Sequence, residues 1–116
     1  MKDYMMIFLG ADYGELGLSP EQIQQRMGKW WGWHEKMEKA GIVKEGNALH
    51  PEVKRISGPN RTVTDLAATE VKELVGGYYV IHVENAEAAA KVAEDFPDYD
   101  IGGTVEIREV MVFDQQ

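Results

Sequence analysis

The sequence contains no cysteine. A thiolate nucleophile, a disulfide framework and a cysteine-ligated zinc site are therefore excluded. Basic residues are also scarce, because 12 lysines and arginines stand against 20 acidic residues and leave a formal net charge of -8. Nucleic acids and anionic membrane surfaces attract clusters of positive charge, so we expect neither as a partner.

Long apolar runs are missing as well. The N-terminal run at residues 4–9 is too short for the core of a signal sequence or for a membrane span, so a cytoplasmic location is expected by default. The chain has 116 residues, of which 44% are hydrophobic. This is the size of one domain that buries a core without disulfides or metal ions.

Local patterns predict a first helix after Ser19. Pro20 suits the first helical position, Gln22 completes a capping box, and Gly41 is predicted to end the helix. At about 100° per residue, one apolar stripe of this helix is expected to face a sheet. The stripe consists of Ile23, Met27, Trp30, His34 and Met37, with Trp31 and Trp33 on its flanks.

A second helix is predicted to begin at the N-cap Asn85 and to stop before Pro97. Its small-residue face consists of Ala86, Ala89, Ala93 and Phe96. Strands are predicted at residues 4–9, 53–57, 61–65, 76–84 and 104–113, with 53–65 forming a hairpin around Gly58-Pro59-Asn60. The segment between Gly41 and the hairpin is interpreted as a loop.

This order of elements predicts an α+β fold of ferredoxin-like type, with two helices on one face of a mainly antiparallel sheet. Residues 4–9 and 76–84 are too apolar on both strand faces for the second sheet face to be left in water. A second copy of the chain, related by a twofold axis, is the simplest way to cover this face. The sequence therefore predicts a homodimer with two sheets face to face.

A family resemblance points the same way. The segment VTDLAATEVKELVGGYYVI, followed after the second helix by DIGGTVEIREVM, resembles the YCII-related, DGPF-type family of small bacterial proteins. The preceding LSPEQIQQRMGKWWGWHEKMEKAGIVKEGNALHP is similar to the helix pattern of that family. The resemblance covers nearly the whole chain and implies a single domain, residues 1–116, of the dimeric α+β barrel superfamily.

The chain departs from the family signature at one place. Where the family has Asp-Gly-Pro-Phe, this sequence has Asp65-Leu66-Ala67-Ala68 and keeps only the acid, so the shape of that loop is expected to differ. Some relatives carry a His and an Asp proposed as a catalytic pair. Their helix histidine lies farther from the helix end than His34, which is seven residues before Gly41, so the resemblance assigns it no role.

Three residues are candidates for acid–base catalysis. His34 lies in the apolar helix stripe, where it would be either a pocket acid or base or a hydrogen-bonded core residue. His82 qualifies if the strand face that it shares with Tyr78 lines the dimer cavity, and is otherwise an interface residue. Asp65 ends a strand, where a carboxylate either orients a histidine or caps a turn.

Five further residues are candidates for ligand binding, namely Trp30, Tyr78, Glu70, Lys72 and Arg108. An aromatic ligand can stack on Trp30, although aromatic residues at helical spacing also form cores. Glu70 and Lys72 form either a charged pocket rim or a solvated turn. Arg108 either binds an anion through its guanidinium fork or pairs with Glu106.

No metal or cofactor is expected. The three histidines, His34, His50 and His82, form no H-x-H or H-E-x-x-H pattern, and the glycine pairs at 76–77 and 102–103 lack a phosphate-loop pattern. Two hypotheses follow. The protein is either a homodimer that binds or transforms a small molecule in a pocket near the dimer interface, or a non-catalytic dimeric regulatory or accessory module.

Overall fold

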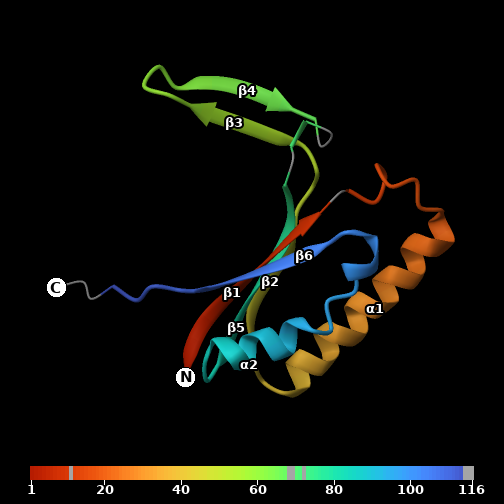
Figure 1. The fold of residues 1–116 in the computed structure, drawn as a ribbon, viewed down its shortest axis with the longest axis vertical. Helices are drawn as coiled ribbons and strands as arrows, with labels where there is room; N and C mark the ends of the chain where they lie inside the picture. Colours follow the sequence, from red (N-terminus) through yellow and green to blue (C-terminus); the bar gives the residue numbers. More distant parts are fainter. Residues whose placement is uncertain (11, 68–69, 72, 114–116) are drawn as a thin grey trace.

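A computed structural model describes residues 1–10, 12–67, 70–71 and 73–113 (Figure 1). Its elements are β1 (Lys2–Gly10), α1 (Pro20–Lys39), β2 (Val43–Ala48), β3 (Val53–Ser57), β4 (Thr62–Leu66), β5 (Leu74–Val83), α2 (Ala86–Ala93), a 3-10 helix (Tyr99–Ile101) and β6 (Thr104–Glu109).

The main sheet is four-stranded, with the order β2-β5-β1-β6. Each neighbouring pair in this order is antiparallel. Two strand–helix–strand units, β1-α1-β2 and β5-α2-β6, interleave in it, which is the ferredoxin-like arrangement that the sequence predicts. In the described part of the chain this sheet is open, with β2 and β6 at its edges.

The predicted hairpin is confirmed, but it lies outside the main sheet. Among the described residues, strands β3 and β4 pair only with each other and form a separate two-stranded sheet between β2 and β5 in the sequence. Gly58 and Arg61 in the turn both have positive φ, 74° and 51°. Figure 1 shows the hairpin reaching away from the helices and from the main sheet.

Strand β2 was not predicted, because residues 43–48 were interpreted as a loop. Its sequence, VKEGNA, contains Gly46 and Asn47, which are both rare in strands. Pairing with β5 nevertheless makes it an edge strand. Glycine is required at 46, because a Cβ there would overlap the ring of Tyr79 on the neighbouring strand.

The core lies between one face of the main sheet and the two helices, which cover the same face (Figure 1). Alternate residues of β1 are buried, as the period of two along a strand requires. The buried cluster consists of Tyr4, Met6, Phe8, Trp33, Met37, Ile81, Val83, Ala89, Ala93 and Phe96.

Both predicted ends of α1 are confirmed. The Gln22 N–H donates to the Ser19 hydroxyl at 3.2 Å, and the Ser19 N–H donates to the Gln22 side chain at 2.8 Å, which completes the capping box. Gly41 follows the helix with a φ of 71°. The predicted apolar stripe was partly wrong, since the buried residues of α1 are Trp33 and Met37, whereas Met27 is 43% exposed.

Further corrections concern the second helix and the last strand. Asn85 caps α2 as expected, with the Ala88 N–H donating to its side chain at 2.9 Å, but Ala86 on the predicted packing face is exposed. Strand β6 ends at Glu109 rather than at residue 113. Its partner β1 begins at Lys2, and the Val110 N–H bond to the Asp3 carbonyl lies next to the start of β1, so the chain beyond has little strand left to pair with.

Candidate functional site

A pocket of about 560 Å³ lies between α1 and the end of the main sheet. The loop after β1, the edge strand β2, the start of β5 and the segment around Asp98 complete its wall. Aromatic side chains are prominent in this wall, and they are Phe8, Tyr13, Trp30, Trp31, Tyr78, Tyr79 and Phe96.

The aromatic wall is held together by ring contacts. The ring of Phe8 stacks on Phe96 at a centroid distance of 5.2 Å and makes a T-shaped contact with Trp30 at a centroid distance of 5.1 Å. Tyr79 lies 5.8 Å from Phe8 in a T-shaped contact. Such pairs are favourable beyond the area that they bury, and they lock the rings in place. The pocket thus has an ordered apolar floor.

The first polar group is a chain of three side chains from α1 and β5, of which His34 and Tyr79 line the pocket and Glu38 pairs with His34. His34 Nδ1 lies 3.0 Å from the Tyr79 hydroxyl, and its Nε2 lies 3.0 Å from Glu38 Oε2. The His34 and Tyr79 rings also stack at 5.8 Å. Burial raises the pKa of the Tyr79 phenol above its ordinary value. The phenol therefore keeps its proton at neutral pH.

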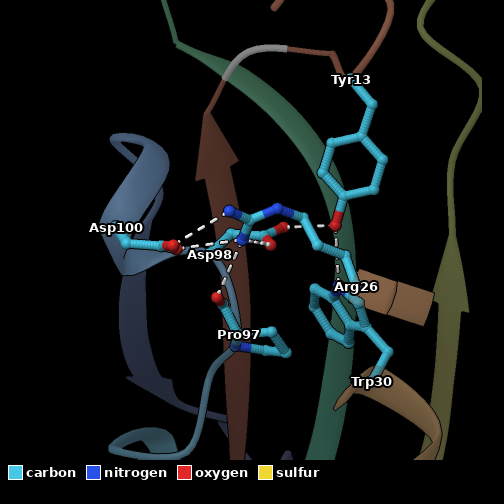
Figure 2. A network of polar contacts seen from close by, with 6 residues as sticks. All are labelled: Tyr13, Arg26, Trp30, Pro97, Asp98 and Asp100. Atoms are coloured by element: carbon cyan, nitrogen blue, oxygen red, sulfur yellow. Dashed lines mark hydrogen bonds and ion pairs between the residues drawn. The ribbon is translucent and has the colours of Figure 1, made fainter. Parts of the chain in front are cut away.

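The second polar group surrounds the buried carboxylate of Asp98 at the other end of the pocket (Figure 2). The Tyr13 hydroxyl donates to Asp98 Oδ2 at 2.7 Å and accepts from the Trp30 indole N–H at 3.0 Å. Burial, followed by the hydrogen bond to Asp98, raises the pKa of Tyr13 to about 12. These bonds fix the loop after β1 against α1.

Arg26 supplies the balancing charge for this cluster. Its guanidinium donates to Asp98 Oδ1 at 3.1 Å, to the Pro97 carbonyl at 3.2 Å and, through two nitrogens, to Asp100 at 3.0 and 2.9 Å (Figure 2). The side chains of Arg26 and Asp98 are only 13% and 12% exposed. The hydrogen bond from Arg26 lowers the pKa of Asp100, and the same contacts raise the pKa of Arg26. The Arg26 charge is thus matched by two carboxylates.

Three of the candidate residues come together at this pocket, since Trp30, His34 and Tyr78 all line it. Asp65 lies on the hairpin, where its carboxylate is 3.1 Å from Lys54 Nζ. Glu70 is exposed after β4. The roles assigned to these residues from the sequence stay predictions.

The other candidates lie elsewhere. Arg108 is exposed on β6 and is paired with Met5 of β1 in register. Lys72 lies outside the residues that the structure describes. Arg108 is not among the described residues that line the pocket.

His82 belongs to the opposite face of the main sheet. Its Nδ1 lies 2.6 Å from Asp3 Oδ1, and Lys44 Nζ lies 2.8 Å from Asp3 Oδ2. The hydrogen bond from Lys44, followed by that from His82, lowers the pKa of Asp3. This polar cluster is separate from the pocket, which lies between the sheet and α1.

Several residues of the two polar groups were missed in the sequence. Glu38 follows His34 by four positions on a helix, so its proximity was accessible from spacing alone. Tyr13 and Asp98 are 85 positions apart, and no local pattern links them. Arg26 pairs with Asp98 and Asp100, which are 72 and 74 positions away, so no local pattern indicates these contacts either.

Two classes of feature are absent from the described residues. No group of three or more His, Asp or Glu side chains is placed there to hold a metal ion. No helix in the same part of the chain combines the length and apolar character needed to cross a membrane.

The fold and the pocket define a ferredoxin-like α+β protein with an aromatic pocket between its first helix and its sheet. The family model of the YCII-related domain matches residues 4–114. The chain therefore belongs to the YCII-related family. A comparison with curated proteins found no match.

Proposed function

We propose that this protein binds a small, planar and largely apolar molecule in the pocket beside α1. The observation that carries the proposal is the pocket itself, about 560 Å³ in volume and walled by ordered aromatic rings. Sites for small molecules typically measure about 300–1,000 Å³ and combine apolar walls with a few fixed polar groups. The His34–Tyr79 pair and the Asp98 cluster are polar groups of this kind.

The charges around the pocket favour a ligand that enters as a neutral molecule over one that already carries a carboxylate or phosphate. Arg26, the cation near Asp98, is already matched by Asp98 and Asp100. His34 is already paired with Glu38. An added carboxylate or phosphate would meet these acidic side chains in a chain with a net charge of -8. A flat molecule with one hydroxyl or carbonyl group suits the wall better.

The same proposal includes a homodimer formed through the sheet face that the helices leave uncovered (Figure 1). By alternation along β1, Met5, Ile7 and Leu9 point to that face, and they remain partly exposed in the single chain. Apolar area of this kind supports an interface between copies. Leu9 and Tyr78, both on this outward side, also line the pocket, which supports a site close to the interface.

Ligand binding is tested with a panel of aromatic and alicyclic fragments by thermal shift and by quenching of tryptophan fluorescence, since Trp30 and Trp31 line the pocket. A ligand at 100 times its Kd adds about 2.7 kcal/mol of stability to the folded state. We expect hits on the unaltered protein and weaker binding by His34→Ala. Glu35→Gln, a change of an exposed side chain next to His34, is the control and should keep the affinity.

The proposal fails if no fragment of the panel raises the melting temperature or quenches the fluorescence. It also fails if the hits bind equally well to a variant with a filled pocket, such as Ala48→Trp, because binding would then lie elsewhere.

A further inference from the structure

We propose that Glu38, His34 and Tyr79 form a relay that takes a proton from a weakly acidic ligand, such as a phenol or an enol, bound in the pocket. This inference rests on the proposed binding function and adds a chemical step to it. Tyr79 is the group that would contact the ligand, and His34 and Glu38 act through it.

The direction of the relay follows from its hydrogen bonds. A carboxylate only accepts, so the 3.0 Å contact between Glu38 Oε2 and His34 Nε2 places the ring proton on Nε2. In the neutral ring Nδ1 then carries the lone pair. The Tyr79 hydroxyl, 3.0 Å away, donates to it. The phenol oxygen keeps its own lone pairs for a proton from another group.

The surrounding packing holds these groups in line. The Tyr79 ring stacks on the imidazole, and the Trp31 ring makes a T-shaped contact with it at a centroid distance of 6.0 Å. Gly46 leaves the space in which the Tyr79 ring lies. His34 is 30% exposed and Glu38 is 68% exposed on its side chain, so the carboxylate chiefly sets the tautomer and contributes little Coulomb energy. Tyr79 and His34 therefore matter more than Glu38.

The step is a balanced proton transfer. The bond between the ligand atom and its hydrogen breaks, and its electron pair stays on the ligand. The proton joins the Tyr79 oxygen while the proton of Tyr79 moves to His34 Nδ1. The products are a ligand anion and an imidazolium held by Glu38. Return of the proton to a different atom of the same ligand is a tautomerisation, which needs no other reactant.

The Asp98 cluster does not compete for this proton. Both carboxylate oxygens of Asp98 already accept hydrogen bonds, one from Tyr13 and one from Arg26. The pocket thus separates a closed polar cluster, which shapes one end, from a polar chain that accepts a proton at the other.

The test uses 4-nitrophenol, whose anion absorbs visible light, at a mildly acidic pH where the free compound is protonated. Tryptophan quenching reports binding and the anion band reports proton transfer. We expect the bound anion fraction to exceed that of free ligand by about tenfold, because a nearby opposite charge favours the charged form by at least one pKa unit. Tyr79→Phe should bind but lose the band, Glu38→Gln should weaken it, and Glu35→Gln should leave it unchanged.

The outcomes separate this inference from the binding proposal. Binding without the anion band overturns the relay and leaves the pocket in place, whereas no binding contradicts the pocket and the relay with it. A Tyr79→Phe variant that still gives the band overturns the relay, because His34 would then act alone. Nitrogen NMR of the ligand-free protein checks the tautomer independently, and a proton on Nδ1 of His34 would also refute the proposed direction.

Discussion

The buried carboxylate of Asp98 is the residue on which one end of the pocket depends. A charge removed from water is tolerated only with partners, and Asp98 accepts from Tyr13 and Arg26. Its partners come from the loop after β1 and from α1, so one side chain ties together segments that are distant in sequence. Secondary-structure patterns carry no trace of such a contact. It was invisible in the sequence for that reason.

The phenol of Tyr13 gives a test at this scale. Its pKa is raised from 10.0 to about 12, first by burial and then by Asp98. A group with a raised pKa in the folded state adds stability below its unfolded pKa and loses it as the pH rises through the folded value. Relative to Tyr13→Phe, the free energy of unfolding of the unaltered protein should therefore fall between about pH 10 and 12.

At neutral pH, Tyr13→Phe should itself cost roughly 1.5 kcal/mol, the low end for a hydrogen bond to a charged group, because the site is partly exposed. Urea unfolding at several pH values measures both quantities. A difference between the two proteins that stays constant up to pH 12 would show that Asp98 and burial do not hold the Tyr13 proton.

Among the elements, the edge strand β2 shapes the site most directly. It brings Gly46 beneath the Tyr79 ring and Asn47 to the Tyr78 hydroxyl, 2.9 Å away. The sequence favours a loop here because glycine and asparagine are poor strand formers. Pairing with β5 overrides that preference. Gly46 weakens β2 as a strand, but it is also the residue that leaves room for the Tyr79 ring.

Replacing Gly46 with alanine should therefore be harmful to the site. The added methyl would overlap the Tyr79 ring, so the ring must move away from His34. Overpacking of this kind costs about 1–3 kcal/mol, which chemical denaturation measures. Fragment binding should weaken as well.

Gly28→Ala is the matched control for this substitution, because a Cβ at Gly28 meets no atom within 4 Å and the position is helical. Alanine there should stabilise the protein by about 0.5–1 kcal/mol. Equal stability of Gly46→Ala and the unaltered protein would mean that the Tyr79 ring is not confined by β2.

The elements also differ in how far the sequence predicts them. Both helix starts follow from local capping residues, Ser19 and Asn85, and both were predicted correctly. The fold class followed from the order of the elements. The helix stripe around Met27 was partly wrong, because packing against the sheet decides which side of α1 is buried. For the pocket, the sequence yielded Trp30, His34 and Tyr78, but their partners depend on tertiary contacts.

At the scale of the whole molecule, apolar side chains remain outside the core in several places. The hairpin exposes Ile56 and Val63, which pair across its strands. The segment after β6 exposes Met111, Val112 and Phe113 and extends away from the sheet (Figure 1). Together with the uncovered sheet face, these surfaces favour an assembly over a lone chain.

The proposed dimer is tested by placing a charge on the uncovered face. Ile7 lies at the centre of β1 and pairs with Tyr78 and Glu106 on the two neighbouring strands. Ile7→Glu should convert a dimer into monomers in sedimentation velocity, because a buried unpaired carboxylate is strongly unfavourable at an interface. Circular dichroism checks that the fold is kept.

Gln25→Glu adds the same charge on an exposed position of α1 and should leave the dimer intact. Sedimentation of the unaltered protein as a monomer at micromolar concentration would contradict the interface. Dissociation by both substitutions would attribute the effect to net charge instead of to the face.

The segment that carries the β3-β4 hairpin is a place where related chains can differ in length and sequence. The chain leaves the main sheet after Ala48, which is paired in register with Gly77 of β5, and it re-enters the sheet at Leu74, where β5 begins. The segment between β2 and β5 thus begins and ends at neighbouring points of the main sheet. The tip of its hairpin can therefore be lengthened, shortened or exchanged at little cost to the stability of the main sheet. The two ends of this segment border the pocket through Leu49, Pro51 and Leu74. Changes in the hairpin segment can therefore alter which ligands the pocket of a related chain selects, while the main sheet and the helices stay the same.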